Sequence, residues 1–580
     1  MLKNLLRCIG EYKKPSILAP ICVTLEVILE VLIPLLMASL IDEGISSENM
    51  NRILFYGLIL VAAAMASLAC GALSGHYAAV ASAGFAKNLR QAMFYKVQDF
   101  SFTNIDHFSP SSLVTRLTTD VTNVQNAYQM VIRVAVRAPI MLISAFVMAC
   151  KINPRLALIY LAIIPVLGCI LFGITVTAHP IFSRVFKTYD KLNNVVQENA
   201  HGIRVVKSFV REDYEKEKFN NISGAIFKDF NKAEKLLAFN SPAMQTCVYT
   251  CMLLISWFGA HMIVSNTMTT GELTSMFTYT MQILMSLMML SMIFVMVTMS
   301  RASVERIDEV LKEQPDIKDA AQPVKEVKNG DICFSHVSFS YSKDKNRLSL
   351  KDINLDIKSG ETVGIIGGTG SAKSSLVQLI PRLYDTSRGT VRVGGKDVRA
   401  YDLAALRDAV NIILQKNVLF SGTVRENLKW GNADASDEEI WEACRAACAD
   451  EFLNRMPDGL DTVLEQGASN LSGGQKQRLC IARALIGKAK ILIFDDSTSA
   501  VDTATEKKIR EALAARKDVT KIIIAQRVTS VMNTDQIIIL DDGKVHRIGT
   551  HAELLADDPI YQEIYASQMK GGDENGSESL

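Results

Sequence analysis

The sequence has almost no net charge and no cysteine pattern of the kind that holds a metal. Its 62 Lys and Arg residues are balanced by 61 Asp and Glu, so charge gives no indication of nucleic acid as a partner. The 11 cysteines form no C-x-x-C pair and do not cluster with the histidines, which indicates reduced thiols in a membrane or the cytosol. Residues 1–14 are basic and interrupted by polar residues, so we expect an amphipathic helix there rather than a cleavable signal peptide.

Apolar residues are abundant instead, and they are unevenly distributed. Hydrophobic residues make up 49% of the chain, and the mean hydropathy of +0.17 is high for a soluble protein. Long apolar runs fill residues 1–300, whereas residues 305–580 read like an ordinary soluble α/β domain. Because 580 residues are too many for one core, we expect at least two domains.

The first half contains six apolar stretches that reach the roughly 20-residue length needed to span a membrane. The connections between them alternate between short ones and two long polar ones, near 83–130 and 179–242, which hold most of the Lys and Arg. The positive-inside rule therefore places the long connections and both termini in the cytoplasm. We predict spans near residues 16–41, 53–82, 131–150, 156–178, 243–264 and 273–298.

Two features of these spans are candidates for substrate contact. Glu26 and Glu30 lie one turn apart in the first span, and carboxylates inside a membrane are costly enough to suggest a role with a cationic substrate or a proton. The alternative is an internal pair with Arg133 or Arg137 of the third span. The sixth span carries a methionine-rich face, whose candidate substrate-contacting residues are Met281, Met285, Met288 and Met292. Such a face suits a cavity that repacks around varied apolar ligands. Ordinary helix packing or contact with lipid explains it equally well.

The second half contains a glycine-rich loop between a predicted strand at 362–366 and a helix beginning near Lys373. The backbone N–H groups of such a loop and the helix N-terminus cradle phosphates, while Lys373 reaches the β- and γ-phosphates and Ser374 binds Mg²⁺. Ala372 stands where the motif requires glycine, so we expect nucleotide binding to survive with a crowded or strained loop. The loop comprises Gly367, Gly368, Thr369, Gly370, Ser371, Ala372, Lys373, Ser374 and Ser375.

A second motif, Leu471-Ser-Gly-Gly-Gln475, precedes a buried strand at 491–494 that ends in Asp495 and Asp496. Two glycines at the start of a helix allow a backbone to approach a phosphate closely. In this order, the loop, the motif and the strand resemble the nucleotide-binding domain of ATP-binding cassette (ABC) transporters. In that family the motif is the signature, whose residues here are Ser472, Gly473, Gly474 and Gln475.

The resemblance extends to the six spans, whose layout is similar to the membrane domain of ABC exporters of the type IV fold. It implies an α-helical membrane domain with long cytoplasmic extensions fused to an α/β P-loop domain that binds ATP and Mg²⁺. We expect a membrane domain at 1–305, with coupling helices near 105–112 and 202–209, and a linker at 306–330. The nucleotide-binding domain follows at 331–570, and a disordered tail at 571–580.

Further residues match family positions. Tyr341 corresponds to the aromatic residue that stacks on adenine, and Gln415 to the glutamine that touches Mg²⁺ and the attacking water. Asp495 is expected to hold Mg²⁺, giving a metal set of Ser374, Gln415 and Asp495. In the family, a loop at the dimer interface follows the aspartate that holds Mg²⁺. The loop Ser499-Ala-Val-Asp502 corresponds to it.

Two positions depart from the family pattern. Asp496 replaces the glutamate that polarises water, and Gln526 replaces the histidine that contacts the γ-phosphate. A carboxylate one methylene too short costs on the order of 100-fold in rate, and a glutamine carries no charge. Together with Ala372 they predict a degenerate site beside an intact signature, as in one subunit of a bacterial heterodimeric multidrug-type exporter. Such a resemblance implies a homologous half-transporter with the usual glutamate as partner.

The resemblance leaves alternatives for function. A nucleotide-sensing regulatory subunit is one, and an importer built on the exporter fold is another. The six spans exclude a soluble ABC protein acting on nucleic acid. For an exporter, the expected partners are the lipid bilayer and a small amphipathic substrate such as a drug, lipid or peptide, and the expected location is the bacterial inner membrane.

Overall fold

The computed structural model describes residues 2–342, 347–496 and 501–573 of the 580-residue chain. Its contacts divide the protein into two compact units. The first unit comprises Met1–Asp99 and Ser109–Glu313, and the second comprises Phe100–Phe108 and Gln314–Leu580. A nine-residue piece from between two helices of the first unit therefore belongs to the second.

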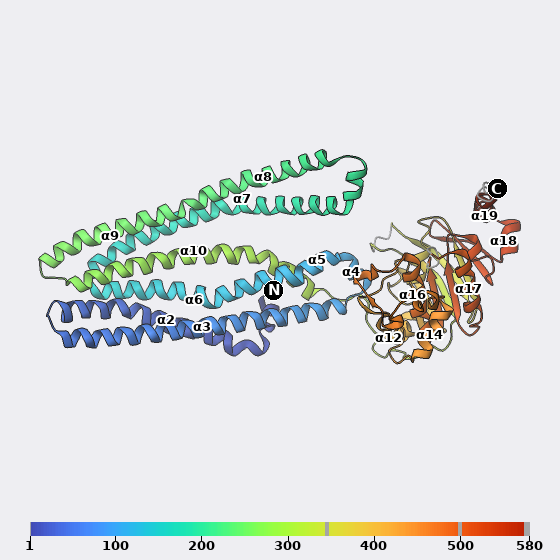
Figure 1. Ribbon diagram of the computed structural model, residues 1–580, viewed down its shortest axis with the longest axis horizontal. Coiled ribbons are helices and arrows are strands. Elements are labelled where there is room, and N and C mark those ends of the chain that lie inside the picture. Colours follow the sequence, from blue (N-terminus) through green and yellow to red (C-terminus); the bar gives the residue numbers. More distant parts are fainter. Residues whose placement is uncertain (1, 343–346, 497–500, 574–580) are drawn as a thin grey trace. The chain divides into compact units, whose positions relative to one another are not determined.

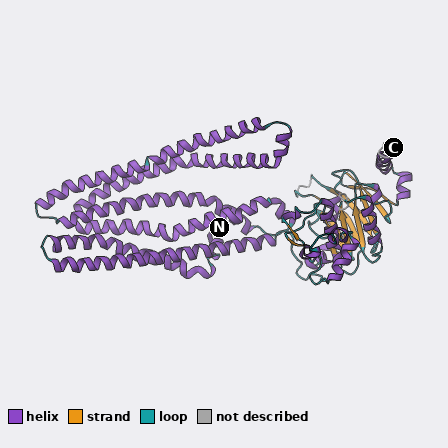
Figure 2. Cartoon of the chain, in the orientation of Figure 1, coloured by secondary structure: helices purple, strands orange, loops and turns teal. Residues whose placement is uncertain are grey.

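The first unit consists of helices joined by short loops in its described residues (Figure 2). Six helical stretches are long and apolar enough to cross a membrane, which confirms the six predicted spans. The elements are α1 (Leu2–Arg7), η1 (Gly10–Tyr12), α2 (Lys13–Ser39), η2 (Leu40–Ile45), α3 (Met50–Gln98), α5 (Pro110–Thr115), η3 (Arg116–Asp120), α6 (Val121–Ile152), α7 (Pro154–Ser208), α8 (Glu212–Ala238), α9 (Asn240–Val264) and α10 (Thr270–Lys312) (Figure 1).

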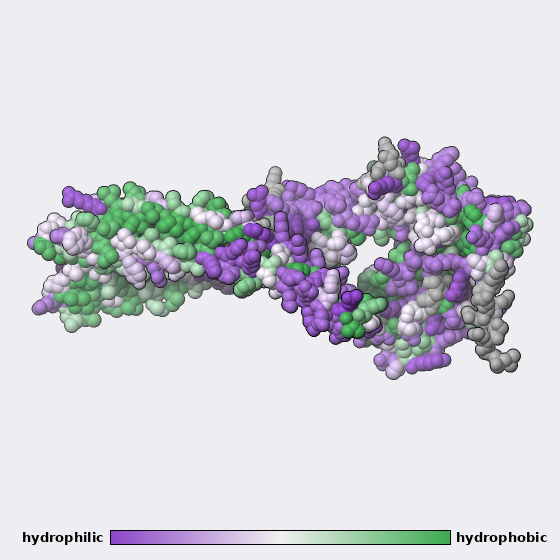
Figure 3. Space-filling view, turned by 90° about the horizontal axis from the view of Figure 1, so that it is seen from above, coloured by the Kyte–Doolittle hydropathy of each residue, from purple (hydrophilic) through white to green (hydrophobic). Residues whose placement is uncertain are grey.

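Local sequence explains where these helices begin. The Asn153 side chain accepts hydrogen bonds from the first turn of α7, and Pro154 takes the first helical position, where its missing N–H costs nothing. Thr269 and Glu272 form a capping box at the start of α10. Between the helices, fully buried Tyr160 and Tyr279 each donate a hydrogen bond of 2.8 Å to a backbone carbonyl. The outer surface around the spans is largely apolar (Figure 3), as a lipid environment requires.

Three expected boundaries differ from the structure. Helix α10 continues to Lys312, past the expected domain end at 305, because its last turns are held by ion pairs, including Arg116 Nη1 to Glu309 Oε2 at 2.7 Å. The expected coupling helix at 105–112 is replaced by two short helices, α4 (Phe102–His107) and α5, which Ser109 and Pro110 separate. The segment 202–209 forms the end of α7 and the following turn, not a helix of its own.

The second unit is built around a six-stranded sheet in the order β12-β11-β3-β10-β9-β6, parallel except for β12. An antiparallel sheet has the order β2-β1-β4-β5, and β7 pairs with β8. The strands are β1 (Ile332–Phe339), β2 (Leu350–Ile357), β3 (Thr362–Ile366), β4 (Arg388–Val393), β5 (Lys396–Asp397), β6 (Val410–Ile413), β7 (Gly422–Thr423), β8 (Val463–Leu464), β9 (Ile491–Asp495), β10 (Thr520–Ile524), β11 (Gln536–Asp541) and β12 (Lys544–Gly549).

Helices cover the large sheet, whose strands β9 and β10 are buried at every position. That burial explains the apolar runs Ile491–Phe494 in β9 and Ile522–Ile524 in β10. The helices are α11 (Lys373–Gln378), α12 (Leu403–Ala409), α13 (Val424–Leu428), α14 (Asp437–Ala446), α15 (Asp450–Leu453), α16 (Gly473–Ile486), α17 (Thr503–Ala514), α18 (His551–Asp557) and α19 (Pro559–Asp573). Residues 571–573, expected in the disordered tail, continue α19, and the rest of that tail lies outside the described residues.

The sheet order determines where the functional loops meet. In parallel strands the carboxyl ends lie at one edge, and ligands bind there. The neighbouring strands β3, β10, β9 and β6 are followed by the phosphate loop, Gln526, Asp496 and Gln415, respectively. Four segments that span about 160 residues of sequence thus converge on one edge.

Candidate functional site

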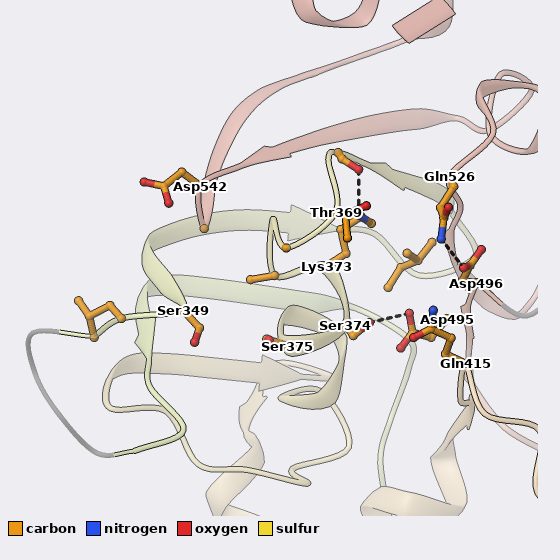
Figure 4. A pocket seen from close by; sticks show the side chains of 16 residues that line it. Ser349, Thr369, Lys373, Ser374, Ser375, Gln415, Asp495, Asp496, Gln526 and Asp542 are labelled. Atoms are coloured by element: carbon orange, nitrogen blue, oxygen red, sulfur yellow. Dashed lines mark hydrogen bonds between the residues drawn. The ribbon is translucent and has the colours of Figure 1, made fainter. Parts of the chain in front are cut away.

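A pocket of about 400 Å³ lies at this edge of the sheet (Figure 4). It brings together most of the residues that the sequence predicts for nucleotide binding. The lining residues are Leu348, Ser349, Gly367, Thr369, Gly370, Ala372, Lys373, Ser374, Ser375, Gln415, Asp495, Asp496, Ile524, Gln526, Asp542 and Gly543.

The phosphate loop leads from β3 into α11, and Ala372 is the residue that caps this helix. Its backbone is left-handed, with φ of 70° and ψ of 27°, a conformation that residues with a Cβ rarely adopt. Alanine in place of the motif glycine therefore strains the backbone of the loop. Ala372 still accepts the first helical hydrogen bond, from Leu376 N at 3.1 Å.

Lys373 folds back over the loop. Its Nζ donates to the carbonyl oxygens of Gly367 and Gly368, each at 2.9 Å. Burial lowers the pKa of the Lys373 ammonium, while the nearby Asp496 and Asp495 act in the opposite direction. The lysine is thus a desolvated cation held by weak neutral acceptors, and a phosphate would be a better partner.

Ser374 and Asp495 form the part of the pocket that could hold a cation. Ser374 Oγ donates to Asp495 Oδ1 at 2.9 Å (Figure 4). Asp495 ends the buried strand β9 and is only 3% exposed. Burial raises the pKa of this carboxyl, and the Ser374 hydrogen bond offsets part of that rise. With Gln415 on the same wall, the site offers hydroxyl, carboxylate and amide oxygens, which are the donors Mg²⁺ prefers.

Asp496 and Gln526 are joined directly across the pocket. Gln526 Nε2 donates to Asp496 Oδ2 at 2.7 Å (Figure 4). Asp496 also has a left-handed backbone, with φ of 48°, and its N–H donates to the carbonyl of Ile524 at 3.1 Å. The two residues that depart from the family pattern therefore contact each other, and this contact fixes the short carboxylate toward Gln526.

The signature residues lie elsewhere on the second unit. Ser472 caps α16, its Oγ accepting from Gln475 N at 3.3 Å while Gln475 Oε1 accepts from Ser472 N at 2.9 Å. Ser472 and Gly473 are exposed, and a Cβ built on Gly473 would meet nothing within 4 Å. Neither these residues nor Gly474 and Gln475 line the phosphate-loop pocket.

Tyr341 is not among the residues that line that pocket. Its hydroxyl lies 2.9 Å from Ser375 Oγ, and its ring packs edge-on against Tyr384 with centroids 5.1 Å apart. Tyr384 in turn donates to Asp106 Oδ2 of α4 at 2.7 Å. The tyrosine side chain is held beside the phosphate loop by the loop's own serine.

The remaining predicted interface loop is described only in part. Asp502 caps α17 by accepting from Thr505 N at 2.9 Å, and that hydrogen bond lowers the pKa of its carboxyl. Ser499 and Ala500 lie outside the described residues.

Sequence reasoning missed one wall of the pocket. Leu348 and Ser349 precede β2, and Asp542 and Gly543 form the turn between β11 and β12. The Asp-Gly pair is a recognisable hairpin signal, but nothing in it indicates a ligand. Only the sheet order, in which β11 neighbours β3, brings that turn to the phosphate loop.

In the first unit, Glu26 and Glu30 are paired within the protein. Arg137 forms ion pairs with both, reaching Glu30 Oε2 at 2.6 Å. The paired-residue alternative thus holds for Arg137, whereas Arg133 lines a pocket together with both glutamates and Arg137. The four candidate methionines of α10 are all more than a third exposed, whereas Met276 is fully buried.

Comparison with known proteins gives two family matches. The ABC transporter transmembrane region matches residues 16–287, and the ABC transporter domain matches residues 350–499. An uncharacterized ABC transporter ATP-binding protein of Bacillus subtilis, YfiB, is 37% identical over 98% of this chain and 99% of its own. An ATP-dependent lipid A-core flippase of Sodalis glossinidius is 29% identical over 97% of this chain and 96% of its own.

One solved structure has the same fold over nearly the whole chain. A bacterial Atm1-family ABC exporter with ATP bound superposes with a TM-score of 0.83 at 24% identity, covering 96% of this chain and 99% of that one. This likeness establishes an exporter-type fold for the six helices and the nucleotide-binding unit together. With both family matches and a 37% identical full-length relative, the chain belongs to the ABC transporter family.

Proposed function

We propose that this chain is one half of a heterodimeric ATP-driven exporter of amphipathic compounds. One observation supports a pair of chains: the phosphate-loop pocket contains no signature residue among the described residues that line it, while the signature lies exposed at another helix start of the same unit. The Asp496–Gln526 contact in that pocket supports a pair of unlike chains. Each ATP site is therefore incomplete within one chain. A second chain has to supply a signature here, and this chain's Ser472 and Gly474 complete the partner's site.

In this proposal the loop amides and Lys373 hold the phosphates of ATP. Ser374, Asp495 and Gln415 hold Mg²⁺, which when bound neutralises charge on the transferred phosphoryl group. The donor set supports this assignment, because three kinds of oxygen ligand converge and Ser374 already contacts Asp495. Tyr341 lies next to Ser375, close enough to the loop to stack on a base after a change of rotamer.

The chain's own site is proposed to hydrolyse ATP slowly. A water-polarising group has to point at the γ-phosphate, but Asp496 is one methylene short and is held by Gln526. Gln526 is neutral and cannot add positive charge during phosphoryl transfer. The site is therefore suited to hold ATP and keep the two nucleotide-binding domains together while the partner's site turns over.

Coupling to the membrane helices is proposed to run through α4 and the turn near 202–209. Support for α4 comes from its membership of the second unit and from the Tyr384–Asp106 hydrogen bond. The exposed Met281, Met285, Met288 and Met292 are proposed to face the substrate. The bacterial relatives support a location in a bacterial plasma membrane, with both termini cytoplasmic.

The test is the composition and asymmetry of the purified complex. Native mass spectrometry after gentle extraction should find this 63.9 kDa chain with a different chain of similar size. In that complex Ser472→Ala should lower ATP turnover at least tenfold, whereas Asp496→Ala should leave most of it. Two identical chains, or turnover that depends on Asp496 and not on Ser472, would overturn the proposal.

A matched control separates the signature's role from its helix cap. Ser472 caps α16 through a capping box with Gln475, and losing a cap alone costs about 1 kcal/mol. Ser436 caps α14 through the same kind of box with Glu439 and lies outside the pocket. Ser436→Ala should therefore destabilise the protein comparably and leave ATP turnover unchanged.

A further inference from the structure

Helices α2, α3 and α6 pack against one another in the first unit (Figure 1). A pocket between them has two acidic and two basic side chains in its lining. Glu26 and Glu30 come from α2, and Arg133 and Arg137 from α6. All four lie on stretches long and apolar enough to span a membrane. Charged groups in such a position are costly and usually have a function.

The pocket has equal numbers of acidic and basic side chains, but these do not form two separate ion pairs. Arg137 is shared by both glutamates, which leaves Glu26 Oε2 buried without a hydrogen-bond partner among the described residues. No ion pair or hydrogen bond of Arg133 is found within the described part of the chain either. One acceptor and one cation therefore face the same pocket without partners. Both are the kind of group whose burial is costly unless paired.

Helix α3 makes room for both groups. A Cβ built on Gly71 would lie 3.0 Å from Glu26 Oε1 and 3.1 Å from its carboxyl carbon, so a side chain at position 71 would press on the carboxylate. A Cβ on Gly75 would lie 3.7 Å from Arg133 Nη1. The two glycines are one turn apart, about 6 Å along the helix. The acceptor and the cation are thus arranged side by side along α3.

We propose that this pocket binds the headgroup of a zwitterionic amphiphile that carries a primary ammonium and an anionic phosphate or carboxylate. The ammonium donates to Glu26 Oε2, and the anion pairs with Arg133, for which guanidinium is a suitable fork-shaped donor. The net charge of the four side chains is zero, so a ligand with one net charge would leave a group unpaired. The apolar surface around the pocket accommodates the ligand's hydrocarbon part.

The inference rests on the proposed export of amphipathic compounds, because it names their headgroup chemistry. It is tested by binding, without nucleotide, to the intact complex in detergent. Three probes with identical short acyl chains are compared by native mass spectrometry: phosphatidylethanolamine, phosphatidylcholine and phosphatidylglycerol. The ethanolamine probe should bind about tenfold more tightly than the glycerol probe, the size of one charge-assisted hydrogen bond. The choline probe should fall between them, because its quaternary ammonium has no N–H.

Two variants and one control assign the preference to this pocket. Arg133→Gln removes the unpaired cation, and Gly71→Ala presses on Glu26; each should reduce the ethanolamine preference to less than twofold. Gly57→Ala lies on the same helix, where a Cβ meets nothing within 4 Å, and should retain it. A purely structural ion cluster would lower the unfolding temperature in the variants but would leave headgroup preference unmoved, and that result would overturn the inference.

A competition arm identifies the source of the headgroup. Displacement of the lipid probe by free phosphoethanolamine supports recognition of the headgroup alone, whereas a preference without displacement supports a lipid within the bilayer. The absence of any ethanolamine preference in the unmodified complex overturns the inference and leaves the proposed function standing. An intact preference in a complex that shows no ATP-driven transport overturns the proposed function alone.

Discussion

Replacing Ala372 with glycine should stabilise the second unit, which is unusual for a substitution that deletes a methyl group. Ala372 has φ of 70°, and the left-handed conformation costs a residue with a Cβ about 1–2 kcal/mol. Glycine adopts it without that cost but loses about 0.5–1 kcal/mol more conformational entropy on folding. The methyl group is partly buried against the core, so its loss lowers the unfolding free energy by a few tenths of a kcal/mol. The expected net gain in unfolding free energy is about 0.5 kcal/mol.

The same substitution at an ordinary helical position should have the opposite sign. Ala512 lies within α17, where alanine is the best helix former and glycine costs about 1 kcal/mol. Ala512→Gly should therefore lower the unfolding free energy of the same unit. A pair of identical substitutions with opposite effects isolates the backbone conformation as the cause.

The chain's three tryptophans allow this measurement in the intact protein. Trp257 lies in the first unit, and Trp430 and Trp441 lie in the second. In a Trp257→Phe background, fluorescence therefore reports the unfolding of the second unit alone, which matters because a two-unit protein does not unfold in one step. For a unit of this size, 0.5 kcal/mol corresponds to a rise of about 1–2 °C in Tm. A fall in Tm for Ala372→Gly similar to that for Ala512→Gly would refute the argument from strain.

Three further predictions concern the site and its link to α4. Asp496→Glu combined with Gln526→His should raise ATP turnover at this chain's own site by about 10–100-fold, measured by phosphate release in a complex whose partner site is inactivated; no gain would mean that neither departure limits hydrolysis. Because burial raises the pKa of Asp495, protons should compete with Mg²⁺ as the pH falls through that raised pKa. Calorimetry should then show Mg²⁺-dependent ATP affinity falling at a higher pH than an exposed aspartate would cause, and Asp495→Asn should abolish the pH dependence; a flat profile in the unmodified protein would contradict this. Tyr384→Phe keeps the ring but leaves Asp106 without its 2.7 Å donor, so it should destabilise the second unit by about 1 kcal/mol and lower transport per ATP hydrolysed, whereas unchanged transport would show that the contact is only structural.

The sequence was sufficient to predict the fold because few structures share either the length of its apolar stretches or the order of its motifs. Six apolar stretches confined the first half to spanning helices, and the loop, signature and buried strand appeared in family order. The residues on the phosphate side of the pocket could be predicted for the same reason, since Lys373, Ser374 and Asp495 occupy fixed places relative to β3 and β9.

The features of the site that could not be predicted from the sequence depend on tertiary contacts. The Gln526–Asp496 hydrogen bond joins residues 30 apart in sequence, and neither residue alone predicts it. The rotamer of Tyr341, turned to Ser375, is set by packing against Tyr384. Arg133 and Arg137 were equally good partners for Glu26 by spacing, and only the packing of α2 on α6 selects Arg137.

The inclusion of Phe100–Phe108 in the second unit also imposes an order in time on synthesis. Asp106 is separated from its partner Tyr384 by 278 residues, which at about 5–20 residues per second takes roughly 15–55 s to translate. During that interval α4 exists without the surface that it contacts in the folded protein, and its turn is held by local contacts such as the capping box of Ser101 and Asn104. The nascent chain therefore presents this segment to chaperones and proteases for about half of its own synthesis, and a mutation there can lower the yield of protein without altering any property of the molecules that mature.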